Sequence, residues 1–196
     1  MEGRERVDAI LDFWFGDSRR DRTHYGEPRE AWFVKDPTFD AIVCDRFLTD
    51  FEQATTGQLD AWKTEPESCL ALILLLDQFP RNLFRGDARA FATDTQAVAV
   101  AQGAIASQLD QSLQRIQRWF VYLPLEHSEN LTHQNQCVEL FRQLGNDPNS
   151  QNVLHYAIQH RDIIARFGRF PHRNAILGRP NTPEEEAFLT QPGSSF

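Results

Sequence analysis

Apolar residues recur every three or four positions along almost the whole chain, and the strict alternation typical of half-buried strands is nearly absent. The first stripe covers residues 7–15 and ends at Gly16, before a polar loop. The second covers residues 39–57 and follows Asp36 and Pro37, an N-cap residue and a proline at the first helical position. The pattern predicts an all-α protein.

Further helices follow from the same pattern. Pro66 opens a helix that is apolar on all sides over residues 70–76, which is typical of a central, buried helix. Asp87 is expected to cap the next helix, and Pro124 is expected to restart or kink the chain. Additional stripes cover residues 113–123, 137–144 and 149–167, the last with Gly168 as its C-cap, and Thr182-Pro183 opens a short final helix. The chain has 196 residues and contains no Pro/Gly/Ser-rich linker, so we expect a single domain, residues 1–196. Because the loops are short, we expect it to be a compact bundle of antiparallel helix hairpins.

One short phrase occurs twice. Residues 74–86 read LLLDQFPRNLFRG and residues 165–178 read ARFGRFPHRNAILG, so Phe-Pro leads to Arg-Asn directly in one copy and after one residue in the other. Proline lacks an amide donor and disfavours helical geometry in the residue before it, so Pro80 and Pro171 are each expected to end the preceding element. The Arg-Asn pair can then tie a turn to a carboxylate or to carbonyls at a helix end.

Composition excludes several classes of protein. Hydrophobic residues make up 41% of the chain and aromatic residues 11%, which excludes a mainly disordered chain. No apolar run approaches the roughly 20 residues of a membrane span, and the N-terminal segment lacks a secretory cleavage site, so we expect a soluble, cytoplasmic protein without a membrane partner. A net charge of −8 argues against nucleic acid as a partner.

Neither a disulfide framework nor a metal site is predicted. Three widely spaced cysteines, Cys44, Cys69 and Cys137, fit small buried side chains better than paired or zinc-binding thiols. No glycine-rich phosphate loop occurs, and we expect no cofactor.

Arginine is locally in excess in this acidic chain. Between residues 160 and 179 one acid, Asp162, faces five arginines: Arg161, Arg166, Arg169, Arg173 and Arg179. A guanidinium group binds carboxylate or phosphate with two parallel hydrogen bonds, so this segment is a candidate anion site.

The most polar phrase in apolar surroundings is residues 126–129, EHSE. If the helix continued, Glu126, Glu129 and His133 would share one face. The Glu-x-x-His pairs of bundle metal sites are missing, and Ser128 lacks the turn of a hydrolase nucleophile. The structural alternative is that these acids pair with arginines of the Phe-Pro turns.

Two buried ionisable residues are expected elsewhere. His160 falls on the apolar stripe of its helix, where a histidine is either a hydrogen-bonded core residue or a functional base. Asp77 directly follows an apolar run and needs a cation nearby. Arg81 is the local candidate, and Arg173 is the distant one.

Several phrases of the chain occur together and in order in one known family. The opening ILDFWFG, LLLDQFPRNLFRG, RWFVYLPLEHSEN, and ARFGRFPHRNAILGR followed by TPEEEAFL resemble a bacterial family known as domain of unknown function 924. The resemblance covers nearly the whole chain and implies a fold similar to the tetratricopeptide-like helical superfamily, although the standard tetratricopeptide signature is absent. It implies no activity and no catalytic residues.

Two functions stay open. The favoured hypothesis is a helical binding module whose groove takes a peptide or a small anionic ligand. Its predicted lining is Arg81, Asn82, Arg85, Glu126, His127, Glu129, Arg169, Arg173 and Asn174. The alternative is a hydrolase-like enzyme that uses His127 or His160 as a general base beside a carboxylate such as Glu126. A closed pocket with histidine and carboxylate in contact favours the enzyme, and arginines already paired with internal acids favour a scaffold or partner binding.

Overall fold

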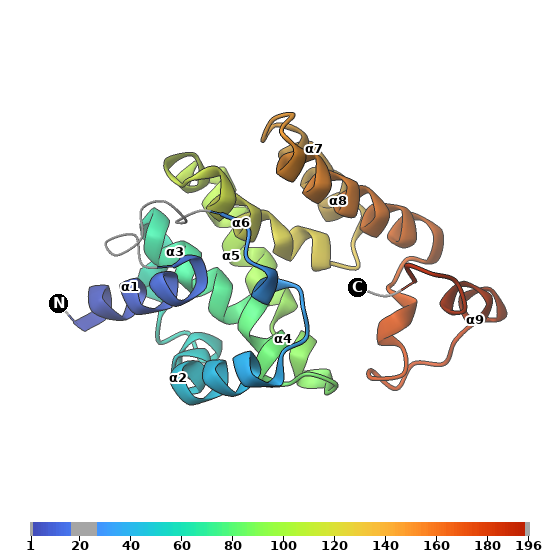
Figure 1. Cartoon of the computed structure of the whole chain (residues 1–196), viewed down its shortest axis with the longest axis horizontal. Coiled ribbons are helices and arrows are strands. Elements are labelled where there is room, and N and C mark those ends of the chain that lie inside the picture. Colours follow the sequence, from blue (N-terminus) through green and yellow to red (C-terminus); the bar gives the residue numbers. More distant parts are fainter. Residues whose placement is uncertain (1, 17–26, 195–196) are drawn as a thin grey trace. The chain divides into compact units, whose positions relative to one another are not determined.

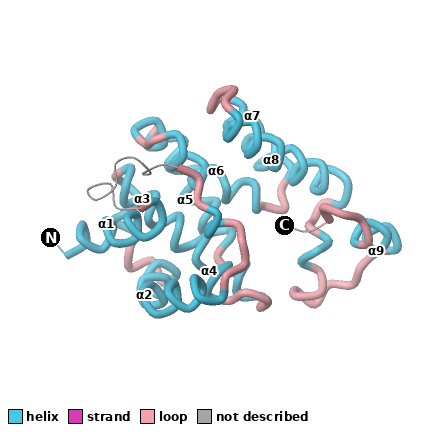
Figure 2. Tube along the Cα trace, in the orientation of Figure 1, coloured by secondary structure: helices cyan, strands magenta, loops and turns pink. Residues whose placement is uncertain are grey.

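A computed structural model of the chain describes residues 2–16 and 27–194 (Figure 1). These residues form helices and turns, and none of them lies in a strand (Figure 2). The all-α prediction is therefore confirmed. Residues 17–26, which belong to the polar loop predicted after Gly16, lie outside the described residues.

The helices follow one another with short connections. They are α1 (Glu2–Phe15), α2 (Pro37–Thr55), α3 (Pro66–Ile73), α4 (Phe79–Leu83), α5 (Asp94–Ala106), α6 (Arg115–His127), α7 (Leu131–Arg142), α8 (Pro148–Phe167) and α9 (Pro183–Leu189). A π-helical turn, η3 (Leu74–Gln78), joins α3 to α4, and a 3-10 turn, η6 (Pro171–Arg173), follows α8.

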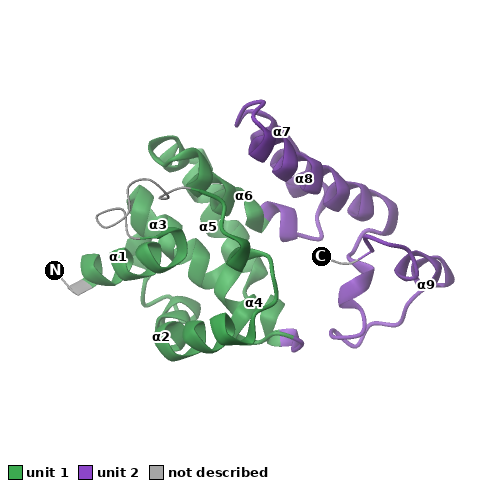
Figure 3. Cartoon of the chain, in the orientation of Figure 1, with its two compact units in different colours: residues 1–85, 89–124 green, residues 86–88, 125–196 purple. Residues whose placement is uncertain are grey.

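The chain divides into two compact units (Figure 3). Unit 1 comprises residues 1–85 and 89–124, and unit 2 comprises residues 86–88 and 125–196. The boundary falls inside α6, which continues through Pro124 to His127 instead of restarting there. The single domain expected from composition stays a prediction.

Aromatic side chains fill the core of unit 1. Trp14 and Phe15 at the end of α1 lie against Phe120, with ring centroids 5.6 and 5.3 Å from it. Trp32 lies 4.9 Å from the same ring, and its Nε1 donates to the Trp14 carbonyl at 2.9 Å. Arg29 Nη1 donates to this carbonyl as well, at 2.7 Å. The last carbonyls of an α-helix have no amide partner within the helix. The carbonyl of Trp14, near the end of α1, accepts hydrogen bonds from the side chains of Arg29 and Trp32 instead.

Helical structure continues through the first Phe-Pro, so the prediction that Pro80 ends its element is wrong. In η3 the amide of Phe79 bonds the carbonyl of Leu74, five residues back. This wider turn accommodates a proline ring, which in an ordinary α-helix clashes with the carbonyl four residues back. That carbonyl belongs to Leu76, and it accepts a hydrogen bond from Thr93 Oγ1 at 2.6 Å.

The helix predicted to start at Asp87 starts later than expected. Residues 88–91 form a 3-10 turn, and α5 begins at Asp94 with Thr93 in the N-cap position. The Thr93 hydroxyl is directed to the Leu76 carbonyl, so the side chain serves the turn at Pro80 and makes no cap bond of its own.

Unit 2 is built around the antiparallel pair α7 and α8 (Figure 1). Asp147 accepts the Ser150 amide at 3.2 Å and so caps α8, and Gly168 ends this helix with φ +69°. At the start of α9 the side chains of Thr182 and Glu185 form a capping box.

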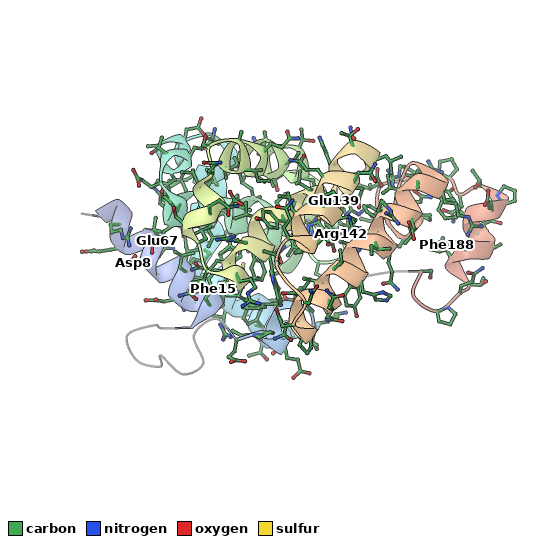
Figure 4. All side chains as sticks on the ribbon, turned by 90° about the horizontal axis from the view of Figure 1, so that it is seen from above. Asp8, Phe15, Glu67, Glu139, Arg142 and Phe188 are labelled. Carbon is green, nitrogen blue, oxygen red and sulfur yellow. The ribbon has the colours of Figure 1, made fainter. Side chains whose placement is uncertain are left out.

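Aromatic packing joins the end of α8 to α9. The Phe167 ring lies 5.0 Å from the ring of Phe188, which Figure 4 labels on α9. The buried partners in this small core are Ile163, Ile164 and Phe170.

Both units carry exposed ion pairs on their surfaces. Figure 4 labels Asp8, Glu67, Glu139 and Arg142, which take part in them. Arg4 pairs with Asp8 and Glu67 in unit 1, and Arg142 pairs with Glu139 in unit 2. Such surface pairs contribute little to stability, about 0–1 kcal/mol each.

Within residues 2–16 and 27–194, every helix is too short or too polar to cross a membrane.

The contribution of the hydrogen bond from Thr93 to the Leu76 carbonyl to stability can be tested. Thr93→Val keeps the shape of the buried side chain but leaves the Leu76 carbonyl without the hydroxyl, which should cost about 1–3 kcal/mol and lower the Tm by several degrees. Thr95→Val, at an exposed position of α5, is the control and should leave the Tm nearly unchanged. Equal melting of both variants in calorimetry would show that the hydroxyl does not support the turn.

Candidate functional site

The predicted site residues are divided between the two units. Unit 1 holds Arg81, Asn82 and Arg85, and unit 2 holds Glu126, His127, Glu129, Arg169, Arg173 and Asn174. His160, the other candidate base, also belongs to unit 2.

In unit 1, Arg81 is held by acids of its own unit. Its Nη1 lies 3.6 Å from Oδ1 of Asp77, whose side chain is fully buried, and its Nη2 lies 3.1 Å from Oδ1 of Asp94. Nη1 also donates to the Asp77 carbonyl at 2.6 Å. The expected pairing of Asp77 with Arg81 is present.

The rest of the first Arg-Asn turn binds α2. Asn82 Nδ2 donates to Asp40 Oδ1 at 2.8 Å, and Arg85 donates to both oxygens of Asp40 at 2.7 and 2.8 Å. Burial raises the pKa of Asp40, but the hydrogen bonds from Arg85 and Asn82 outweigh it and hold the pKa below its usual value. This turn therefore connects α2 to α4, so Asn82 and Arg85 stabilise the fold.

In unit 2, four side chains form what we term the Phe170 cluster: Phe170, His160, His172 and Arg173. The Phe170 ring is fully buried. The rings of His160 and His172 lie 5.5 and 5.6 Å from it, centroid to centroid, and the Arg173 guanidinium carbon lies 4.5 Å from its centroid. The chain makes this possible because α8 ends at Gly168 and η6 turns back after an extended Phe170.

His160 makes two close polar contacts through Nδ1. The Tyr156 carbonyl oxygen lies at 2.9 Å, and Glu126 Oε1 lies at 3.3 Å, with the side chains of His160 and Glu126 only 7% and 6% exposed. A carbonyl only accepts hydrogen bonds, so Nδ1 carries the proton and Nε2 is the acceptor of the neutral ring. The other carboxylate oxygen of Glu126 lies 4.0 Å from Cys137 Sγ.

Burial and neighbouring cations keep the histidines of the cluster neutral. Burial, and then the nearby His127, Arg173 and His172, lower the pKa of His160 to about 3 against the opposing bond to the Tyr156 carbonyl. Burial and Arg173 lower the pKa of His172 to about 4. A neutral imidazole offers one donor and one acceptor, and it can gain a proton if a negative charge arrives.

Burial also decides the state of the cysteine beside Glu126. Burial first, and then the charge of Glu126, raise the pKa of Cys137 well above its usual value. The residue therefore stays a thiol, which makes it a poor nucleophile.

Glu129 and Arg179 hold the backbone of Phe170 in place. Arg179 binds Glu129 with two hydrogen bonds, at 2.7 and 2.9 Å. The Phe170 amide donates to Glu129 at 2.8 Å, and the Phe170 carbonyl accepts from Arg179 at 3.2 Å. Burial raises the pKa of Glu129, but the bonds from Arg179 and the Phe170 amide outweigh it and lower the pKa.

Two predicted ligand-binding residues of unit 2, Arg169 and Asn174, bind other side chains of the same unit. Arg169 donates to both oxygens of Glu185 at 2.6 and 2.8 Å, and its hydrogen bond is the main reason that the pKa of Glu185 falls to about 2. Asn174 donates to Asn181 at 2.8 Å and accepts from Arg179 at 2.9 Å.

The predicted common face of Glu126, Glu129 and His133 is wrong. Helix α6 ends at His127, and α7 starts at Leu131 because Asn130 caps it by accepting the amides of residues 132 and 133. His133 Nδ1 lies 2.9 Å from Ser128 Oγ instead. No three His, Cys, Asp or Glu residues in the described ranges are placed to hold a metal ion.

His172 and Arg179 are absent from the residues predicted to bind. His172 is the residue inserted between Phe-Pro and Arg-Asn in the second copy of the phrase, and this insertion is the signal that marks it. Arg179 belongs to the arginine excess, but its pairing with Glu129 brings together residues far apart in sequence.

The Glu129 pair predicts a pH-dependent stability. Because the folded-state pKa of Glu129 is lowered, its stabilisation is complete above the ordinary value of 4.5 and is lost as the pH falls through the folded-state pKa. Arg179→Gln should therefore cost about 2 kcal/mol near neutral pH, and its Tm deficit should shrink below about pH 4. Arg161→Gln, which removes a pair with Asp162 on α8, is the control. A deficit that stays constant with pH would contradict this account.

Two of three comparisons with known proteins give a match. The family model described as "Bacterial protein of unknown function (DUF924)" matches residues 10–193. The solved "Structure of Protein of Unknown Function ATU0120 from Agrobacterium tumefaciens" is similar, with 42% identity, a TM-score of 0.82, and coverage of 95% of this chain and 97% of that one. Curated protein sequences give no match. The match over nearly the whole chain shows that this protein belongs to the DUF924 family.

Proposed function

We propose that the protein is a helical binding module for a small anionic ligand, received in unit 2 by His127, His172 and Arg173 beside Phe170 and His160. The observation that carries the proposal is the convergence of basic side chains on a buried aromatic ring. Arg173, His127 and His172 all lie close enough to His160 to lower its pKa, and Arg173, Arg179 and His127 act in the same way on His172.

An anion suits this surrounding better than a neutral or cationic ligand does. Arg173 is only 6% exposed, and a guanidinium group binds carboxylate or phosphate with two parallel hydrogen bonds. Partial enclosure also protects such a contact from the salt screening that weakens surface pairs. The N–H of neutral His160 is donated to the Tyr156 carbonyl, so among the two histidines of the cluster it is His172 that can donate an N–H to the same ligand.

The proposed site is smaller than the groove predicted from the sequence. Asn82 and Arg85 are engaged with Asp40, and Arg81 is engaged with Asp94 and Asp77, all within unit 1. These residues support the scaffold, and we place the ligand contacts among the side chains of unit 2.

The test is a thermal-shift screen at fixed ionic strength with phosphates, nucleotides, dicarboxylates and C-terminal peptides. A ligand at about 100 times its Kd stabilises the folded state by roughly 2.7 kcal/mol, which raises the Tm by about 5–10 °C. Arg173→Gln and His172→Gln should lose this shift.

Arg166→Gln is the matched control for this screen. Arg166 lies in the last turn of α8, the helix that carries His160, and pairs with Glu184 at 2.8 Å on the surface, so its loss should leave the ligand shift intact. No shift with any anion, or an undiminished shift in both cluster variants, would contradict the proposal.

A hydrolase-like enzyme is the second candidate, and one contact favours it. Glu126 and His160 form the histidine–carboxylate pair that such an enzyme needs, at 3.3 Å and almost fully buried. Two features weigh against it. A pKa of about 3 makes His160 a weak base near neutral pH, and the Ser128 hydroxyl lies against His133 rather than His160.

The enzyme hypothesis has its own test. Hydrolysis of activated esters and phosphate esters should be faster with the protein than without it, and His160→Gln and Glu126→Gln should each lower kcat by at least about 100-fold. His155→Gln, at an exposed position of α8, serves as the control. Equal rates for the protein and the variants would leave binding as the function.

A further inference from the structure

We infer that unit 1 contains a second binding site, a pocket for a small molecule that has an aliphatic body and a polar head group without net charge. The pocket has a volume of about 410 Å³ and is formed by the end of α2, the 3-10 turn η2 (Asp60–Thr64), α3 with η3, and α5. Its lining residues all belong to unit 1, so the inference does not depend on the anion site proposed in unit 2.

The inner part of the pocket is apolar. Leu72 in α3, Leu76 in η3 and Val100 in α5 are buried and line it. Ala54 at the end of α2 and Ala104 in α5 complete this part. Aliphatic side chains offer van der Waals contact and exclude water, so they suit the aliphatic body of a ligand. Small-molecule sites usually have volumes of about 300–1,000 Å³, and this pocket lies within that range.

A glycine of α5 keeps one side of the pocket open. Inside a helix, glycine is less favourable than alanine, so its presence there usually has a packing or conformational reason. At Gly103 neither reason applies. Among the described residues, no atom of a packing neighbour lies within 4 Å of the place that a Cβ would take, and the backbone does not have a positive φ. The missing side chain instead leaves space beside Ala99 and Val100, which also line the pocket.

One face of α5 forms a wall of the pocket. It carries Gln96, Ala99, Val100 and Gly103, whose spacing is i, i+3, i+4 and i+7. Gln96 Nε2 donates to the Thr55 carbonyl at 3.2 Å, so this side chain connects α5 to the end of α2, the opposite wall. The oxygen of the same amide is an acceptor that a donor group of the ligand can use.

The charges at the rim favour a head group without net charge. Among the described residues that line the pocket, the charged ones are Asp60 and Lys63, and Lys63 Nζ lies 2.7 Å from Asp60 Oδ1. A charged head group would take one of them from its partner, whereas an amide or a zwitterion offers a donor and an acceptor together. The two side chains are 45% and 61% exposed, so their pairing is weak and can rearrange around a ligand.

The experiment is an NMR titration of the full chain, at neutral pH and fixed ionic strength, with four probes that share one branched carbon skeleton. Isocaproamide is neutral and free leucine is a zwitterion, so both have no net charge. Isocaproate is an anion and isohexylamine is a cation. Because the aliphatic body is the same in all four, differences in affinity report the head group.

We expect isocaproamide and leucine to bind, and each charged probe to bind about threefold to fivefold more weakly, in line with the free energy of an exposed ion pair. Gly103→Leu should abolish the binding of all four probes to the pocket. A helical side chain points back toward the N-terminus, so the new leucine would lie over Ala99 and Val100 and fill the space. Since leucine favours the helix more than glycine does, this variant should also raise the Tm by about 2–4 °C, which separates lost binding from lost folding.

Ala106→Leu is the matched control. Ala106 is an exposed residue of α5 and is not among the described residues that line the pocket, so this variant should bind the probes as the parent does. Two further variants test the head group. Lys63→Gln leaves the acid of the rim and should shift the preference toward isohexylamine, and Asp60→Asn should shift it toward isocaproate.

Each possible failure has a distinct meaning. If neither isocaproamide nor leucine binds, or if Gly103→Leu binds them as tightly as the parent, the pocket is not a site. If a charged probe binds the parent as tightly as isocaproamide, the proposed class of head group is wrong. Isocaproate bound in unit 2 would still bind to Gly103→Leu, so the outcome for this pocket is independent of the outcome for the anion site.

Discussion

The carboxylate of Glu129 is the interaction on which the rest of unit 2 depends. It binds Arg179 with both oxygens and also accepts the amide of Phe170. Arg179 in turn bonds the Phe170 carbonyl, so one ion pair satisfies both backbone polar groups of a fully buried residue. The two side chains are only 24% and 27% exposed, and losing one of them is expected to cost about 2 kcal/mol, so the pair holds the backbone of Phe170 in place. His160, His172 and Arg173 can then gather around a ring whose position is set by its own backbone.

The two copies of the Phe-Pro phrase show how one sequence pattern serves two purposes. In unit 1 the chain stays helical through Pro80. Arg81 binds Asp77 and Asp94, and Asn82 binds Asp40. In unit 2 the helix has already ended at Gly168, and the inserted His172 lies beside the Phe170 ring. The first copy strengthens a scaffold. The second brings ionisable groups together in a buried place, where their charges influence one another strongly.

The helical class and most helix ends follow from local sequence, because their causes are local. Asp36 caps α2, Gly168 ends α8, and α9 begins directly after Thr182, each as predicted. The continuation of the helix through Pro80 could not be predicted, because it depends on a π-helical turn and on a hydroxyl from Thr93, which is distant in sequence.

The individual residues of the candidate site can be recognised in the sequence, but the contacts between them cannot. His160 and Glu126 stand out in the sequence as polar residues in apolar surroundings, but their contact depends on how α8 packs beside the end of α6 within unit 2. The break at Asn130 removed His133 from the expected face, since an N-cap outweighed helical spacing. The arginines that appeared available by counting are largely paired, Arg169 with Glu185 and Arg179 with Glu129. Counting charges along a sequence does not reveal such pairs, because their partners come from other segments.

Burial and the charge of Arg173 hold His160 and His172, the two histidines of the Phe170 cluster, neutral. The most direct measurement is an NMR titration of the histidine side chains in the protein without ligand, with His155 as the internal reference for an exposed ring. We expect His160 and His172 to remain neutral down to about pH 5, with the proton of His160 on Nδ1, in keeping with pKa values of about 3 and about 4. Titration of both rings near the ordinary value of 6.5 would contradict it, because the cluster would then be too open to water to act as described.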